Sequence, residues 1–245
     1  LPVDGNPENT HWVVYAADGD YALGAFDGRV FDAETPKIRF NYGNCFYASQ
    51  TFSNIPEADG RRIQIAWGTI GHRDMPFNQM MNFPVALTLR TTDEGIRLFA
   101  QPVREIERLH TTKHLLDRRA LSERENPLRD ISGELFDIRV ECLVGDAETL
   151  TFTIRGVEVT YSLKDRELAC LDKRAPLSPD AGKIRLQFLV DRTSIEIFGN
   201  DGRVYMPMGV VLDDTNRSLA IHARGGAAHI INLEINELRA AWVAP

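Results

Sequence analysis

The sequence predicts an all-β fold. Short segments rich in β-branched and aromatic residues recur along the chain, and Gly, Asp, Asn and Pro separate them. This pattern is typical of strands joined by tight turns. The stretches "ADGD" (17–20) and "FDGR" (26–29) place Asp-Gly pairs where hairpins are expected to reverse. In the first part of the chain, strands are therefore expected at 11–17, 21–26, 46–52, 61–67, 84–90 and 95–101.

The character of the sequence changes after Val103. The stretch "VREIERLHTTKHLLDRRALSERENPL" interleaves charged residues with isolated Ile and Leu, and it lacks the alternation of a strand. We expect residues 104–132 to be a linker with helical turns. The chain then divides into a first β region, residues 1–103, and a second one, residues 133–245.

The second region carries eight or so short segments with strand character. Antiparallel sheets have to cover one face each, so a two-sheet β-sandwich is the expected arrangement. The expected strands are 134–144, 148–156, 157–163, 183–190, 194–199, 203–211, 218–223 and 228–238.

Composition excludes several classes of function. The 35 acidic and 28 basic residues give a net charge of -7, and no basic cluster offers a track for phosphates, so nucleic acid is not an expected partner. Apolar runs stay below the roughly 18 residues of a membrane span. The spacing of Cys45, Cys142 and Cys170 fits buried free thiols better than a zinc site or disulfides. The histidines are scattered singly, and neither metal nor cofactor is expected.

The stretch "VDRTSIEIFGNDG" (190–202) collects Asp191, Glu196 and Asp201 within eleven positions. These could form a catalytic cluster, but local chemistry explains each of them. Asp191 and Asp201-Gly202 suit turns, and Glu196 alternates with apolar neighbours as a solvated strand position would. The preceding strand, 183–190, is apolar on both faces and is expected to be central. We therefore interpret these carboxylates as structural.

Two blocks carry a resemblance to a known family. The first runs from "NYGNCFYASQTF" through "GRRIQIAWGTIGHRDMPFNQMMNFPVALTLRTTDEGIRLFAQPVREIERL", and the second is "FLVDRTSIEIFGNDGRVYMP". They resemble glycoside hydrolase family 32, the β-fructofuranosidases that include invertases, levanases and exo-inulinases. The resemblance implies a partial five-bladed β-propeller, from the end of the third blade through the fourth and fifth, followed by a C-terminal β-sandwich.

The family hydrolyses a terminal fructosyl bond with retention, using a carboxylate nucleophile and a carboxylic acid/base about 5 Å apart. Its catalytic residues lie in motifs like "NDPNG", "RDP" and "ECP", none of which occurs here. Three segments resemble them superficially, but order and region disqualify each: "GNDGR" (199–203), "HRDMP" (72–76) and "VECLV" (140–144). No catalytic residue is therefore assigned.

The resemblance also implies substrate-binding positions. Trp67, in "IAWG", matches a family Trp that lines the fructose pocket, while packing between blades is the alternative. Tyr47, Ser49 and Gln50 are candidates for the pocket rim, and Asn78 can contact sugar hydroxyls. The complete set of candidates is Asn44, Tyr47, Ser49, Gln50, Trp67 and Asn78.

Three functions remain open. The chain begins at Leu1 and not at Met, so we expect processing or truncation upstream, which fits a fragment of a fructan- or sucrose-hydrolysing enzyme that is inactive alone. Another polypeptide could instead supply the first blades of a split enzyme, or the chain could self-associate. A non-catalytic carbohydrate-binding or assembly module is the third possibility. The resemblance suggests a periplasmic or extracellular location.

Overall fold

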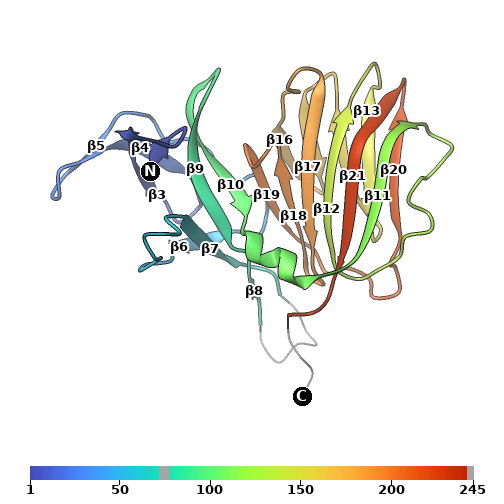
Figure 1. Ribbon diagram of the computed structural model, residues 1–245, viewed down its shortest axis with the longest axis horizontal. Coiled ribbons are helices and arrows are strands. Elements are labelled where there is room, and N and C mark those ends of the chain that lie inside the picture. The colour runs from blue at the N-terminus through green and yellow to red at the C-terminus, as the bar shows by residue number, and fades with distance from the viewer. Residues whose placement is uncertain (72–77, 242–245) are drawn as a thin grey trace.

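The computed structural model describes residues 1–71 and 78–241, and the regular elements of these residues are strands apart from one short 3₁₀ helix (Figure 1). The all-β prediction is confirmed. The segment "HRDMP" at 72–76 lies outside the described residues. Over the part of the chain that is described, helices are too short and too polar to cross a membrane.

Two sheets form the N-terminal half. A three-stranded sheet contains β3 (Trp12–Tyr15), β4 (Tyr21–Phe26) and β5 (Phe31–Ala33). A seven-stranded sheet has the order β2-β1-β9-β7-β6, with β10 beside β9 and β8 beside β7. Its strands are β1 (Pro2–Val3), β2 (Asn6–Thr10), β6 (Tyr47–Thr51), β7 (Arg62–Gly68), β8 (Met80–Met81), β9 (Val85–Thr92) and β10 (Gly95–Pro102).

The six strands expected in this half are all present, with shifts of a few residues at their ends. Both Asp-Gly stretches connect neighbouring strands of the three-stranded sheet as expected. The short strands β1, β2, β5 and β8 were not predicted, because two to five residues are too few to show a periodic pattern.

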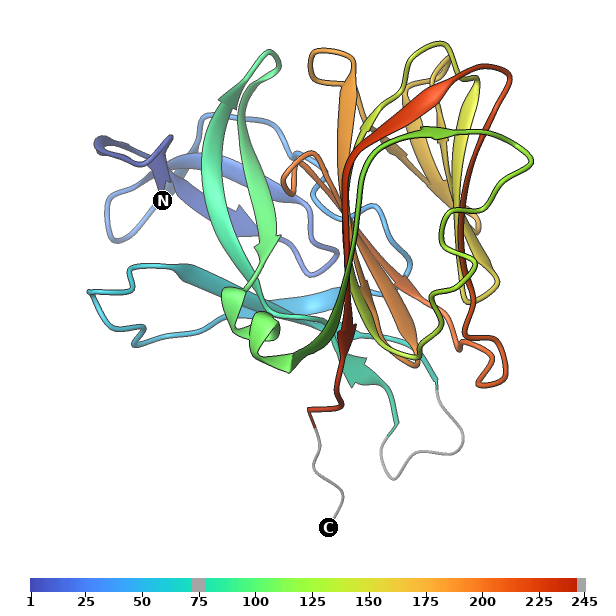
Figure 2. The ribbon, with the colours of Figure 1, turned by 45° about the vertical axis from the view of Figure 1, so that its right-hand side comes forward.

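The C-terminal half consists of two further antiparallel sheets (Figures 1 and 2). A six-stranded sheet has the order β11 (His110–Leu121), β21 (Ala228–Leu238), β12 (Phe136–Leu143), β17 (Lys183–Val190), β18 (Ser194–Gly199) and β19 (Val204–Gly209). A five-stranded sheet has the order β16 (Lys173–Pro176), β15 (Glu167–Cys170), β14 (Val157–Ser162), β13 (Thr149–Ile154) and β20 (Leu219–Arg224).

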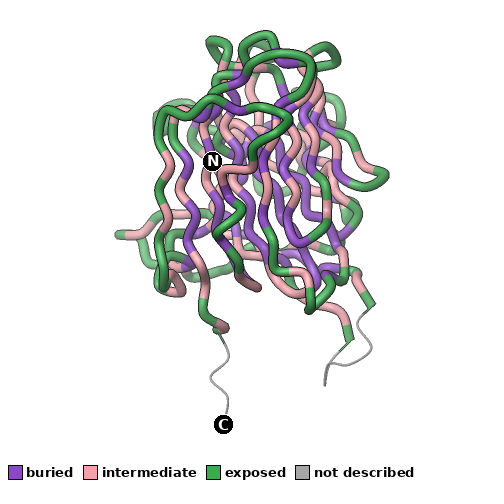
Figure 3. The backbone as a smooth tube through the Cα atoms, turned by 90° about the vertical axis from the view of Figure 1, so that its right-hand side faces the viewer, coloured by how far each residue is buried: buried purple, intermediate pink, exposed green. Residues whose placement is uncertain are grey.

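The two C-terminal sheets share one hydrophobic core. Phe188 of the six-stranded sheet packs against Phe152 of the five-stranded sheet, with ring centroids 5.1 Å apart. All three cysteines are buried and free, as predicted, and Cys142 and Cys170 belong to this core. Buried residues follow the strands, whereas the loops that join them are exposed (Figure 3).

The expected helical linker is largely wrong. Within residues 104–132, all of which the structure describes, the assigned helix is the 3₁₀ helix η1 (Arg104–Leu109), and the next twelve residues form β11, an edge strand paired with β21. Most β11 side chains are exposed. Backbone pairing with β21 therefore stabilises this strand, and the apolar alternation that reveals a half-buried strand in a sequence is absent.

The expectation of a solvated Glu196 is also wrong. Every residue of β18 is buried, and Glu196 is 0% exposed. The reason is that β17–β19 have a core on each face. Ile197 belongs to the core between the two C-terminal sheets, whereas Phe198 and Tyr205 belong to the core of the N-terminal half. The prediction that strand 183–190 is central is confirmed, since β17 lies between β12 and β18.

The remaining features of "VDRTSIEIFGNDG" agree with the sequence interpretation. The Asp191 side chain accepts a hydrogen bond from the Arg192 N–H at 2.8 Å. Asp201 and Gly202 both have positive φ, as expected of a turn. Glu141, the acidic residue of "VECLV", lies on β12.

Two glycines allow the halves to approach closely. The Tyr42 and Cys45 amides donate to carbonyls of β19, so the "NYGNC" block runs along that edge strand. A Cβ on Gly43 would lie 1.9 Å from the Pro207 carbonyl oxygen, and one on Gly202 would lie 1.9 Å from that of Ala100. Only glycine permits such contacts without displacement of the backbone.

Candidate functional site

An exposed apolar strip crosses three neighbouring strands of the seven-stranded sheet. Trp67 on β7 is the cross-strand partner of Tyr47 on β6 and of Met81 on β8. Directly paired residues project from the same face of a sheet, so the three side chains are neighbours. The Tyr47 and Trp67 rings meet edge to face with centroids 5.9 Å apart. All three remain open to solvent, with exposures of 45%, 40% and 55% for Tyr47, Trp67 and Met81.

A β-bulge determines which of the polar candidate residues lies on the same face as this strip. Ala48 has a φ of 45°, and the register between β6 and β7 shifts between Tyr47 and Gln50. Gln50 then pairs with Ile65, two residues from Trp67, and so lies on the same face as the aromatic pair. Ser49 instead accepts a hydrogen bond from the buried Gln64 amide at 3.1 Å. The structure thus brings Gln50 to the strip and directs Ser49 to a side chain of the opposite face.

The side chain of Asn44 has a different partner. Its Oδ1 accepts a hydrogen bond from the Gly209 N–H at 2.8 Å, and its Nδ2 donates to the Gly209 carbonyl at 3.4 Å. This pair of contacts attaches the segment before β6 to the end of β19. The Asn44 amide, a predicted sugar contact, instead joins the two halves of the molecule.

Asn78 lies on the wall of a groove beside the strip. The groove has a volume of about 610 Å³, and Trp67 forms part of its lining. Its walls also include Met80, Phe83 and residues from the C-terminal half such as Leu238. Trp67 and Met81 therefore belong to both surfaces, whereas Tyr47 and Gln50 do not line the groove.

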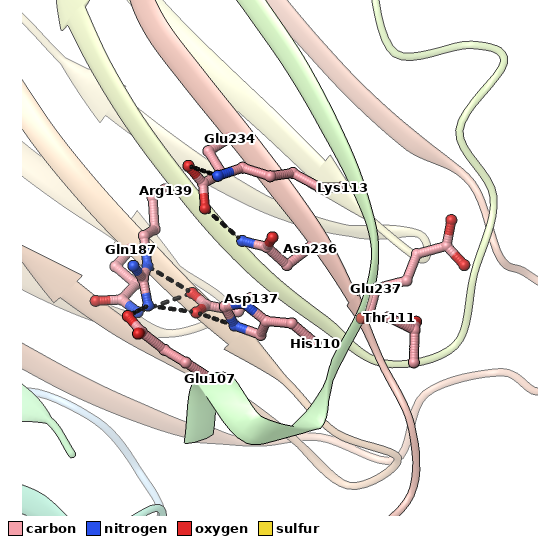
Figure 4. Close-up of polar contacts among 10 residues, drawn as sticks. All are labelled: Glu107, His110, Thr111, Lys113, Asp137, Arg139, Gln187, Glu234, Asn236 and Glu237. Atoms are coloured by element: carbon pink, nitrogen blue, oxygen red, sulfur yellow. Dashed lines mark hydrogen bonds and ion pairs between the residues drawn. The ribbon is translucent and has the colours of Figure 1, made fainter. Parts of the chain in front are cut away.

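A cluster of ionisable side chains on the six-stranded sheet contains none of the residues of this strip (Figure 4). The buried Asp137 carboxylate lies 3.0 Å from His110 Nε2 and accepts from Arg139 and Gln187, each at 2.8 Å. Arg139 also donates to Glu107 of η1 at 2.9 Å. Through the Arg139–Glu107 contact, the cluster links η1 to the six-stranded sheet.

Among the residues of the C-terminal half that the structure describes, the strand aromatics are enclosed and form no exposed platform. Six of them lie on strands and have exposures of 3% or less: Phe136, Phe152, Tyr161, Phe188, Phe198 and Tyr205. The exposed aromatic pairs among described residues lie instead in the N-terminal half. Besides Tyr47 and Trp67, these include Trp12 and Phe26, with centroids 5.2 Å apart.

Sequence reasoning missed Met81 as a member of the strip. Met81 is the cross-strand neighbour of Trp67, but it is not among the candidates that the sequence suggests. The pairing depends on a two-residue strand, β8, which leaves no periodic signal in the sequence.

Family models match nearly the whole chain. The N-terminal domain of glycosyl hydrolases family 32 matches residues 8–102, and the C-terminal part of the same family matches residues 105–237. The boundary between the two matches lies where the seven-stranded sheet ends and η1 begins.

Individual relatives agree with the family models. A levanase of Bacillus subtilis is 30% identical over 99% of this chain and 42% of its own length. An extracellular exo-inulinase of Aspergillus niger is 24% identical over 99% of this chain and 54% of its own. The chain thus spans about half, or less, of the length of these curated relatives.

Solved structures show the same fold. An exo-inulinase from Aspergillus awamori superposes with a TM-score of 0.83 over 99% of this chain and 56% of its own, at 18% identity. A fructofuranosidase from Schwanniomyces occidentalis, complexed with fructose, superposes with a TM-score of 0.80 over 98% of this chain and 59% of its own, also at 18% identity.

Proposed function

Given that this chain belongs to glycoside hydrolase family 32, we propose that it is the part of a β-fructosidase that holds one wall of the sugar pocket. Tyr47 and Trp67 contact a fructosyl unit of levan, inulin or sucrose, and Gln50 hydrogen-bonds its hydroxyls. The observation that carries this proposal is the exposed edge-to-face pair of Tyr47 and Trp67 on adjacent strands. An indole suits a sugar because its face covers C–H groups and its N–H donates to a hydroxyl.

The proposal extends to the architecture. The sheets of residues 1–103 belong to a five-bladed β-propeller, contributing the end of the third blade and the fourth and fifth, and the C-terminal pair of sheets is a β-sandwich. Support comes from the division of the chain into two hydrophobic cores and from the two family models that meet at the same boundary.

The chain alone does not hydrolyse fructosyl bonds under this proposal. Retaining hydrolysis needs a nucleophile and an acid/base flanking the bond about 5 Å apart. The three motifs that carry these groups in the family are absent from the sequence. Incubation of the purified chain with sucrose, levan and inulin tests the point. We expect no fructose above the uncatalysed level, and release at enzyme-like rates would refute it.

The chain has a protein partner in this view, either a polypeptide that supplies the first blades or a second copy of itself. The three-stranded sheet leaves Trp12, Val14 and Phe26 exposed at 56%, 46% and 40%. A contiguous apolar surface of this kind favours association. Sedimentation velocity over a range of concentrations should show self-association, and a monomer at high concentration would count against this part of the proposal.

Binding is tested on the full chain by NMR. Titration with fructose and with levan-derived oligosaccharides should move the Trp67 indole N–H signal, with a Kd roughly in the millimolar range expected of a weak, partly open site. Trp67→Ala should abolish the response of the surrounding residues. Trp12→Ala removes another exposed indole outside the strip and should leave sugar binding unchanged. Equal losses in both variants, or no response to any sugar, would exclude the strip as a sugar site.

A further inference from the structure

Glu196 is a buried carboxylate with three hydrogen-bond donors and no exposure to solvent. Its Oε1 accepts from the Asn82 side chain at 3.2 Å and from the Phe83 N–H at 2.8 Å. Its Oε2 accepts from the Tyr205 hydroxyl at 2.7 Å. The donors are all neutral, and two of the three come from the N-terminal half.

The two donors from that half continue directly from β8. Met81, the residue before Asn82, is the cross-strand partner of Trp67, and Met80 is that of Gly68. The Asn82 N–H also donates to the Ala66 carbonyl at 2.9 Å. The segment 80–83 therefore lies between β7 and β18, held on one side by the strand that carries Trp67 and on the other by Glu196.

Attachment of the two halves alone does not require this carboxylate. Gly43 and Gly202 already bring the halves into backbone contact at two other places. Burying a charged carboxylate away from solvent costs free energy, so its presence needs a reason beyond packing. Its two hydrogen bonds to consecutive residues, Asn82 and Phe83, fix the position of the short strand β8. The contacts of Glu196 are therefore better explained by a role in positioning β8 than by a role in joining the two halves.

We propose that Glu196 is a positioning residue for the sugar-binding strip: through Asn82 and Phe83 it holds β8 against β7 and thereby sets the position of Trp67 and Met81. The role of the strip in sugar binding rests on the proposed function, but the mechanical coupling from Glu196 to Trp67 does not.

The protonation state of Glu196 should be visible at Trp67. Burial raises the pKa of the Glu196 carboxyl to about 7, against the smaller opposing effect of its hydrogen bonds. The ionisable groups around it are Tyr205 from β19, Cys45 from the segment beside β19, and Asp191 from the turn before β18. Burial raises the pKa of the Cys45 thiol to about 11 and places that of Tyr205 far above 10. Neither group therefore titrates near neutrality.

The test follows the tryptophan indole N–H signals of the ¹⁵N-labelled full chain in the absence of sugar. Trp67→Phe and Trp12→Phe identify the signals of these two residues among the three tryptophans of the chain. We expect the Trp67 signal to move by several line widths as the pH is raised from 5 to 8, and Glu196→Gln to abolish this movement. Asn82→Ala, which removes the linking amide, should displace the Trp67 signal at every pH.

Two comparisons make the result decisive. Glu141→Gln removes a half-buried carboxylate on β12 that does not touch β8, and should leave the Trp67 signal unchanged. Trp12, on the three-stranded sheet, should not respond in any variant. The proposal is overturned if Glu196→Gln and Asn82→Ala both leave Trp67 as in the wild type, or if Trp12 moves as much as Trp67. If the coupling is observed but fructose moves no signal, the positioning role stands and the proposed function fails.

Discussion

The two halves of the molecule bury their apolar side chains in different ways. Between the six-stranded and five-stranded sheets, aromatic residues such as Phe188 are fully enclosed, because each sheet covers the other. The N-terminal sheets share their core with β17–β19 but leave Tyr47, Trp67 and Trp12 between 40% and 56% exposed. The C-terminal sheets therefore enclose their aromatic side chains, whereas the N-terminal sheets leave these three open to solvent.

The largest effect should come from a cavity in the enclosed core. Phe188→Ala removes a fully buried ring that packs against Phe152, and should lower the free energy of unfolding by about 3–5 kcal/mol. Phe52→Ala makes the same truncation at a side chain of the N-terminal half that is 46% exposed, and should cost less than about 1 kcal/mol. Urea unfolding monitored by circular dichroism measures both. Similar losses in the two variants would remove the contrast between the halves.

The next effect concerns the boundary between the halves and depends on pH. The folded state raises the pKa of Glu196 from 4.5 to about 7, so it binds this proton more tightly than the unfolded chain does. The contribution of Glu196 is most favourable below pH 4.5 and declines as the pH rises to about 7, by about 3 kcal/mol in total at about 1.4 kcal/mol per pH unit. Glu196→Gln has no ionisable group at this position, so its free energy of unfolding lacks this pH dependence.

The measurement is the free energy of unfolding of both proteins from pH 4 to 8. The difference in stability between Glu196→Gln and the wild type should change in favour of the variant across this range, and Glu141→Gln controls for the loss of one carboxylate. A difference that is constant with pH would show that Glu196 does not titrate in this window.

The third effect tests the close contact between β10 and the turn after β18. Gly202→Ala places a methyl group 1.9 Å from the Ala100 carbonyl oxygen at a φ of +87°. Gly28→Ala has a similar φ of +94° but meets nothing within 4 Å, so it reports the backbone strain alone. Gly202→Ala should be less stable than Gly28→Ala by about 1–3 kcal/mol, the usual cost of overpacking. Equal unfolding midpoints would mean that the backbone at this contact shifts to accommodate the methyl group at little cost in stability.

The sequence reveals strands whose apolar residues face a core, and it conceals strands whose burial or pairing depends on distant neighbours. Central strands such as β12 and β17 are predicted because their apolar residues face a core, whereas the exposed edge strand β11 falls in the segment expected to be a linker with helical turns. Glu196 was placed in solvent because alternation along β18 cannot show that a second core covers its outer face.

The candidate site shows the same limit. Trp67 and Tyr47 were selected from a resemblance, and their pairing across β6 and β7 is consistent with that choice. Ser49 and Gln50 are adjacent in sequence, and only the bulge at Ala48 determines that Gln50 joins the strip. Asn44 is a sugar-binding candidate in the sequence, and its actual partner, Gly209, could not be inferred because it is 165 residues away.

The smallest effects should come from surface ion pairs. Both halves carry such pairs, so we expect them to contribute little to the difference between the halves. Lys113 contacts Glu234 at 2.8 Å on the six-stranded sheet, and Lys37 contacts Asp18 at 2.9 Å beside the three-stranded sheet. Both lysines are more than half exposed. Solvent and salt screen such pairs, so Lys113→Met should change the free energy of unfolding by less than about 1 kcal/mol, and Lys37→Met by an amount too small to resolve. Unfolding curves at low and high salt measure both. If one variant lost much more stability than the other, charge as well as apolar burial would contribute to the difference between the halves.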